Sequence, residues 1–145
     1  MAATTQDRNT PYRDGELTPI PVAAKEKIPA GVIVCINAEG YAINGKEAPG
    51  LIYAGRSDDS VDNTDGENGD QYILVRSHKA FCWENDGSIT QAHLGKRACV
   101  LDNQTVTADD GSAPASGDAK ADATAATRSQ AGTIIMIDTD GVWVY

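Results

Sequence analysis

The side chains best suited to catalysis at neutral pH are two histidines, His78 and His93. A nucleophilic enzyme needs a base of this kind beside a nucleophile and an orienting group. Neither histidine adjoins such a motif, and the sequence has no GxSxG, no GxxxxGK[ST] and no GxGxxG after a predicted strand. The carboxylate pairs 58–59 and 109–110 fall in predicted loops, which hold catalytic separations poorly. We therefore expect no catalytic residues and no enzymatic activity.

The acidic, glycine-rich segment Ser57–Asp70 has the residue types that bind calcium. An EF-hand loop needs ligands at its first, third and fifth positions and glycine at the sixth. Placing Gly66 sixth puts Val61 first, and placing Gly69 sixth puts Thr64 first and Gly66 third. We expect a solvated loop that interrupts the sheet, with an irregular calcium site as the alternative. No metal or other cofactor is predicted.

Three cysteines, Cys35, Cys82 and Cys99, lie far apart in the sequence and in apolar surroundings. The absence of a CxxC pair gives no support to a zinc ribbon or a thioredoxin-like site. Cysteines in apolar segments usually behave as small core residues. We expect three reduced core cysteines, and a single disulfide between two of them stays open as the alternative.

The charge and hydropathy of the chain limit its partners. Its formal net charge is −9 and it has no basic stripe, whereas a nucleic-acid-binding surface needs Lys and Arg to displace counterions. No apolar run approaches the roughly 18 residues of a membrane span, and the N-terminus lacks the apolar centre of a signal peptide. We expect no nucleic-acid partner, no membrane insertion and no export signal.

The element that organises the rest of the chain is a predicted hairpin within residues 27–47. Val32–Ile36 is an apolar, largely β-branched run, residues 37–40 form a turn with Gly40, and Tyr41–Ile43 starts the return strand. Because the first strand is apolar at every position, both of its faces must be covered.

Further short strands are expected along the chain, separated by turn residues. Residues 80–84 should return beside 71–75, residues 97–101 and 104–107 should form a hairpin around Asp102-Asn103, and a helical turn capped by Thr90 is expected at 89–95. The remaining strands are predicted at 19–22, 51–54, 133–137 and 142–145, the last one paired in the sheet. This pattern predicts a mainly β fold, a small barrel or sandwich of short antiparallel strands.

Two segments depart from this pattern. Residues 1–18 are polar and contain Pro11 and Tyr12, which favours either a disordered tail or an extended arm that becomes ordered against a partner. Residues 108–131 are rich in Ala, Asp and Ser, and we expect a surface loop there, with weak helical tendency at 121–126. The predicted organisation is an arm at 1–18 and a single β domain at 19–145.

Several stretches together resemble the capsid decoration, or head cement, proteins of tailed bacteriophages. The resemblance covers most of the chain, and residues 108–127 depart from it by being longer and richer in Ala and Asp. The similar stretches are Asp7–Leu17, Lys27–Ile43, Ala54–Trp83, Ile89–Val106 and Ala131–Tyr145.

The resemblance implies a β-tulip-like structural protein, made in the host cytoplasm and located on the exterior of the virion. Such proteins bind the major capsid protein, often as homotrimers, and fasten neighbouring capsid subunits in the expanded head. We expect the arm to make the capsid contact, through Asp7, Arg8, Asn9, Thr10, Pro11 and Tyr12. The alternative is a virion-surface module that binds host carbohydrate or a host receptor.

Overall fold

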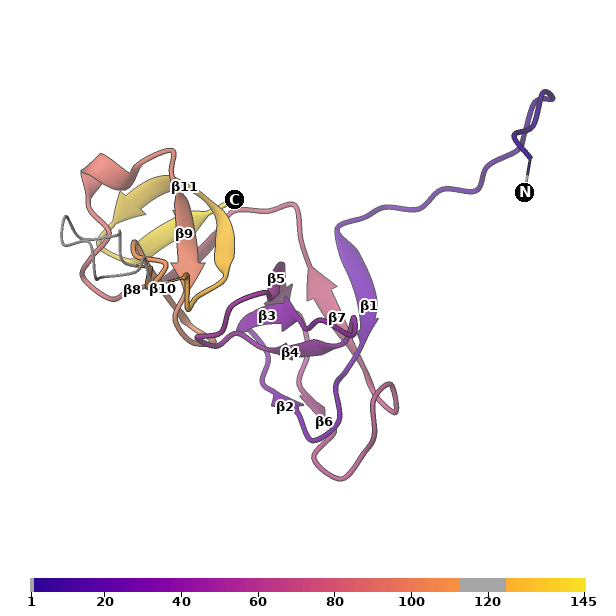
Figure 1. Ribbon diagram of the computed structural model, residues 1–145, viewed down its shortest axis with the longest axis horizontal. Coiled ribbons are helices and arrows are strands. Elements are labelled where there is room, and N and C mark those ends of the chain that lie inside the picture. The colour runs from indigo at the N-terminus through magenta and orange to yellow at the C-terminus, as the bar shows by residue number, and fades with distance from the viewer. Residues whose placement is uncertain (1, 113–124) are drawn as a thin grey trace, which may run out of the picture.

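The computed structural model describes residues 2–112 and 125–145, and these form a mainly β fold of two parts. An open sheet has the strand order β1-β7-β5-β3-β4, and a closed barrel has the order β10-β8-β12-β11-β9 (Figure 1). The sheet strands are β1 (Leu17–Pro21), β3 (Ile33–Ile36), β4 (Ala42–Asn44), β5 (Ile52–Ser57) and β7 (Tyr72–Arg76). The barrel strands are β8 (Phe81–Asn85), β9 (Arg97–Val100), β10 (Thr105–Thr107), β11 (Gln130–Asp138) and β12 (Gly141–Val144). The predicted mainly β class with a small barrel is confirmed.

Strand β3 is covered on both faces, as its apolar sequence predicts. Ile33 and Cys35 point into one hydrophobic cluster, whereas Val34 points into another, and all three are fully buried. This alternation follows from the two-residue period of a strand. The predicted turn leads into β4, with the Asn37 side chain accepting the N–H groups of Glu39 and Tyr41.

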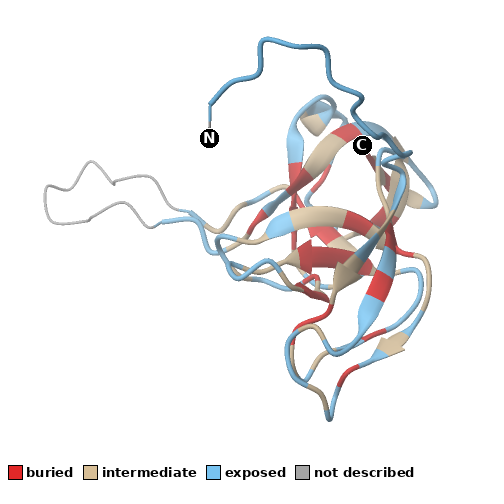
Figure 2. Ribbon diagram, turned by 90° about the vertical axis from the view of Figure 1, so that its right-hand side faces the viewer, coloured by how far each residue is buried: buried red, intermediate tan, exposed pale blue. Residues whose placement is uncertain are grey.

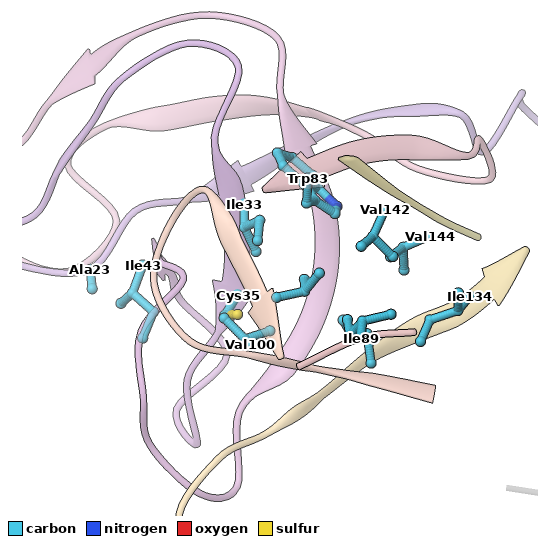
Figure 3. Close-up of a cluster of buried hydrophobic side chains, with 13 residues drawn as sticks. Ala23, Ile33, Cys35, Ile43, Trp83, Ile89, Val100, Ile134, Val142 and Val144 are labelled. Atoms are coloured by element: carbon cyan, nitrogen blue, oxygen red, sulfur yellow. The ribbon is translucent and has the colours of Figure 1, made fainter. Parts of the chain in front are cut away.

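The larger hydrophobic cluster, which we call the barrel cluster, joins the sheet to the barrel. Ile33, Cys35 and Ile43 from the sheet pack with barrel residues that include Trp83 and Val142 (Figure 3). The Trp83 indole also donates a hydrogen bond of 3.0 Å to the hydroxyl of Tyr53 on β5. The second cluster, which we call the sheet cluster, lies on the opposite face of the sheet. The two-stranded pair β2 (Lys27–Ile28) and β6 (Val61–Asp62) helps to cover it.

The expected pairing of 80–84 with 71–75 is wrong. Strand β7 pairs with β1 and β5, whereas β8 pairs with β12 and β10 in the barrel. His78, which has a φ of +58°, lies in the connection between the two strands. The chain leaves the sheet at this connection, so that Ile73 and Val75 face the sheet cluster while Trp83 faces the barrel cluster.

The acidic segment at 57–70 is more than a solvated loop. Strand β5 extends through Gly55 to the buried Ser57, beyond its predicted end, and Val61–Asp62 forms β6. Gly55 has a φ of +137°, and a Cβ there would overlap the carbonyl oxygen of Arg76. Asn63 is almost fully buried, and its amide donates to the carbonyl oxygens of Ala23 (2.9 Å) and Glu67 (3.0 Å).

The later elements follow the expectation with shifted boundaries. A 3-10 turn at Gln91–His93 follows Thr90, the hairpin of β9 and β10 forms around Asp102, and β12 pairs with both β11 and β8. Strand β11 already begins at Gln130, so the predicted loop ends before residue 131. Most of the predicted helical tendency at 121–126 lies outside the described residues, and Ala125 and Ala126 are not helical.

Candidate functional site

The six residues predicted to contact a capsid lie in an extended arm that projects from the sheet (Figures 1 and 2). Residues 2–16 are all exposed, and Tyr12 is 99% exposed. Among the residues that the structure describes, the side chains of Asp7 to Tyr12 make no hydrogen bond or ion pair. The arm therefore exposes both charged and apolar groups to solvent.

The root of the arm is fixed to the connection between β7 and β8. The Ser77 N–H donates to the carbonyl oxygen of Glu16 at 2.8 Å, and the Ser77 hydroxyl donates to that of Gly15 at 3.1 Å. The Glu16 carboxylate lies 3.1 Å from the Lys79 ammonium. Strand β1 begins immediately afterwards at Leu17, so it includes the last two residues of the predicted 1–18 arm. These contacts fix where the arm leaves the body.

An apolar surface continues from the arm along the outer face of β1 and β7. The register places Pro19 opposite Leu74 and Pro21 opposite Tyr72, while Ile20 and Ile73 face inward. Tyr72 is 60% exposed, and Leu17 and Leu74 are each more than one-third exposed. We call Leu17, Pro19, Pro21, Tyr72 and Leu74 the ribbon face. The ribbon face lies on the same side of the sheet as Ile33 and Cys35 of β3, which pack into the barrel cluster.

Strand β1 lies at an edge of the sheet, and its two prolines have no N–H group that could donate a hydrogen bond to another strand. The residues that bond to β7 alternate along β1, since the carbonyl of Glu16 and the N–H of Val22 both face β7. Pro19 and Pro21 occupy the intervening positions, whose backbone groups face away from β7. Proline lacks an N–H, so this edge loses two donors, and the edge is open only as far as Val22, which forms a bridge to Ala42 of β4.

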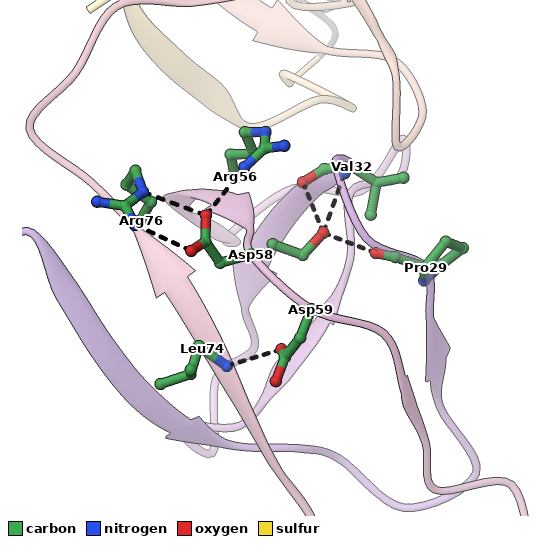
Figure 4. A network of polar contacts seen from close by, with 8 residues as sticks. Pro29, Val32, Arg56, Asp58, Asp59, Leu74 and Arg76 are labelled. Atoms are coloured by element: carbon green, nitrogen blue, oxygen red, sulfur yellow. Dashed lines mark hydrogen bonds and ion pairs between the residues drawn. The ribbon is translucent and has the colours of Figure 1, made fainter.

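A charged network holds β5 against β7 beside the ribbon face (Figure 4). The Asp58 carboxylate accepts hydrogen bonds from Arg76 (2.9 and 3.1 Å) and from Arg56 (2.9 Å). The hydrogen bond from Arg76 is the main reason why the pKa of Asp58 lies below its usual value. The next residue, Asp59, accepts the Leu74 N–H at 3.1 Å. These bonds set the position of the strand that carries Tyr72 and Leu74.

The structure does not bring the two histidines into a shared site. His78 lies in the connection after β7, with Nδ1 2.9 Å from the Ser77 hydroxyl. His93 lies in the 3-10 turn, where Nδ1 accepts the Thr90 N–H at 2.9 Å.

The three cysteines are free, with Cys35 and Cys99 buried and Cys82 only half-buried. Burial raises the pKa of the Cys35 thiol to about 12, so this thiol stays protonated at neutral pH.

Two shallow clefts lie near the junction of the sheet and the barrel. One, of about 560 Å³, is lined by residues that include Tyr53, His78, Lys79 and Tyr145. The other, of about 650 Å³, is lined by residues that include Arg97, Asp110, Arg128, Gln130 and Tyr145.

Residues 2–112 and 125–145 contain no group of three or more His, Cys, Asp or Glu side chains placed to hold a metal ion. The same residues contain no helix long and apolar enough to cross a membrane.

Comparison of the chain with protein-family models, curated proteins and solved structures finds no match. The geometry of the arm and the ribbon face is therefore the only support for a role of these two surfaces. The sequence indicated the arm but not the ribbon face, because Tyr72–Val75 is apolar throughout and hides which residues point outward. The available signal was the spacing of Pro19 and Pro21, since prolines two residues apart in a strand indicate a free edge.

Proposed function

We propose that this protein binds the outer surface of a tailed-phage capsid and fastens neighbouring major capsid subunits, stabilising the expanded head. The observation that carries the proposal is an exposed arm fixed at its root, next to a partly exposed apolar face on which Tyr72 is 60% exposed. A protein that binds only the assembled shell adds its binding free energy to the stability of the shell.

The arm and the ribbon face suit such a contact in different ways. An extended segment of about 15 residues spans up to about 50 Å, enough to cross a boundary between two shell subunits. Ordering it on binding costs conformational entropy, which the apolar Pro11 and Tyr12 must offset. The ribbon face needs no ordering, because its side chains are held on paired strands. We further propose that the bound form is a homotrimer, so that three arms act together.

Deleting residues 2–14 tests this proposal directly. The deletion keeps Gly15 and Glu16, whose contacts fix the root, so the β domain should fold normally. We expect the truncated protein to lose most of its binding to expanded heads that lack the wild-type protein, measured by co-sedimentation. The control is Lys46→Gln, at an exposed lysine of the β domain, which changes a charge but leaves the arm intact. Unchanged occupancy by the truncated protein would exclude the arm as the capsid contact.

A second candidate function is recognition of a host carbohydrate, and the 650 Å³ cleft favours it. Tyr145 is 62% exposed at this cleft, and Arg97, Asp110 and Gln130 provide hydrogen-bonding groups around it. An aromatic face beside planar polar side chains is a suitable surface for a sugar ring. A glycan array with the wild type and with Tyr145→Ala tests this candidate. Binding that Tyr145→Ala abolishes, together with heads equally stable with and without the protein, would favour it over the capsid role.

A further inference from the structure

The outer wall of the barrel carries a row of apolar side chains across three strands. The register places Trp143 of β12 opposite Cys82 of β8 on one side and opposite Met136 of β11 on the other. Val142 and Val144, which flank Trp143, are fully buried in the barrel, so Trp143 points outward. Residues directly opposite one another on paired strands share a face and lie in contact. The three side chains therefore form one continuous row on the outside.

A β-bulge in β11 widens this row. Ile134 pairs with Val144, and the next pair joins Met136 to Trp143, which leaves Ile135 as an extra residue. Strict alternation after the inward Ile134 would turn Met136 into the barrel. The bulge instead exposes Ile135 (48%) and Met136 (46%) together, and Ile137 returns to pack on the barrel cluster. Bulges often re-aim side chains in this way, and here the result is a larger apolar surface.

Leu94 extends the row beyond the strands. It precedes Gly95, whose N–H donates to the carbonyl oxygen of Ile134 at 2.8 Å, so the turn lies against β11. Leu94 is 46% exposed. We call Cys82, Leu94, Ile135, Met136 and Trp143 the barrel-wall patch. It belongs to different strands from the ribbon face and is separate from the arm.

The charges around the patch indicate what could cover it. Glu84, Asp138 and Asp140 act electrostatically on the Cys82 thiol and, after burial, are the causes that raise its pKa. Asp138 also accepts the Trp143 indole N–H at 2.9 Å. Lys96 lies at the opposite end, beyond Leu94. The three carboxylates lie at the Cys82 and Trp143 end, whereas Lys96 and the exposed Arg97, which is opposite Thr133, lie at the Leu94 end. The carboxylate end attracts a basic surface, and two copies of a chain with a net charge of −9 repel each other.

We propose that the barrel-wall patch is a docking site for a partner protein segment that presents apolar side chains between lysines or arginines. Apolar contact with Ile135, Met136 and Trp143 supplies the centre of the interface, and the carboxylate end selects the charge of the partner. This surface is independent of the capsid contact proposed for the arm, so either proposal can fail without the other.

The probe is a synthetic 12-residue peptide that alternates Leu with Lys, compared with the same peptide carrying Glu in place of Lys. Because the chain has only two methionines and two tryptophans, methyl-labelled Met136 and the Trp143 indole give separate NMR signals on the patch. We expect the Lys peptide to shift both signals while the signal of the buried Trp83 indole stays in place. The Glu peptide should shift neither, and about 0.5 M salt should weaken binding of the Lys peptide by screening the carboxylates.

Three double variants separate specific docking from general attraction to an acidic protein. The uncharged double substitution Ile135→Ser/Met136→Ser should weaken binding of the Lys peptide at least about tenfold. The Trp143 indole signal measures this change in affinity. Its control, Tyr72→Ser/Leu74→Ser on the ribbon face, should bind like the wild type. Glu84→Gln/Asp140→Asn should lower both the affinity and the salt dependence.

Any one of four results would overturn the proposal. The first is equal binding of the two peptides, and the second is equal loss of binding in the patch and control variants. The third is a shift of the Met136 and Trp143 signals with protein concentration alone, because a second copy would then be the occupant. Absence of any shift with the Lys peptide would also count against a basic partner.

Discussion

At the scale of single residues, two buried or bonded polar side chains hold the segment that follows β5. Asn63 fixes the acidic loop by donating to main-chain carbonyls, and Asp58 links β5 to β7 by accepting from two arginines. Both residues belong to a stretch whose composition suggests only a solvated loop. Their roles depend in part on two groups far away in the sequence, the Ala23 carbonyl and the Arg76 guanidinium, which composition does not reveal.

The lowered pKa of Asp58 predicts a specific pH dependence of stability. A carboxyl whose pKa is lower in the folded state stabilises that state above its unfolded pKa of about 3.9, and this contribution is lost as the pH falls through the folded pKa. Asp58→Asn should therefore lower the free energy of unfolding at pH 7, and its difference from the wild type should shrink toward pH 2. Urea unfolding across this range measures the difference. Asp14→Asn in the exposed arm is the matched control and should leave the unfolding curve unchanged at every pH.

At the scale of elements, the proline-bearing edge of β1 explains how an open sheet with an exposed apolar face avoids pairing with other strands. The barrel has no free edge because it closes on itself, whereas the sheet has an open edge at β1 as far as Val22, which forms a bridge to Ala42 of β4. Pro19 and Pro21 remove two outward N–H donors without removing any hydrogen bond to β7. The ribbon face can thus stay exposed while edge-to-edge pairing is disfavoured.

Replacing both prolines tests this explanation. Pro19→Val/Pro21→Val restores two donors and increases β propensity on the part of the edge that is open before Val22, so we expect concentration-dependent self-association with the native strand order retained. Light scattering over a dilution series measures the effect. Pro11→Val in the arm restores a donor outside the sheet and should not associate more than the wild type. If the double variant scattered like the wild type at all concentrations, the prolines would not be the barrier to pairing.

At the scale of the whole molecule, the sheet and the barrel share one hydrophobic cluster and should unfold together. Ile33 contributes to that cluster from the sheet, and Val142 contributes from the barrel. Neither part can separate without exposing the cluster to water, and that exposure is the main free-energy cost of unfolding.

Ile33→Ala should therefore destabilise both parts equally, by about 2–5 kcal/mol. Residue-resolved NMR in denaturant should show the signals of Val34 in the sheet and Val144 in the barrel disappearing at the same, lowered midpoint. Ile52→Ala removes an isoleucine that is 61% exposed and should change the free energy of unfolding by less than about 0.5 kcal/mol. Loss of the Val34 signal at a denaturant concentration that preserves Val144 would mean that the two parts are energetically independent.

Local chemistry was enough to predict much of this protein. The apolar run at Val32–Ile36, the Asn37 and Asp102 turns and the helical turn after Thr90 depend on interactions within a few residues, and the structure contains each of them. The exposed arm also follows from composition, because polar residues 2–16 offer little apolar area to bury.

The division into a sheet and a barrel was decided only by tertiary structure. Residues 71–84 contain two apolar strands joined by a turn signal, and the local pattern favours pairing them. They separate because Val75 and Trp83 each gain more contact by packing into different clusters formed by distant strands. The same reason explains why the ribbon face and the barrel-wall patch could not be predicted. Whether an apolar strand residue is buried depends on which neighbours cover its face, and those neighbours come from elsewhere in the chain.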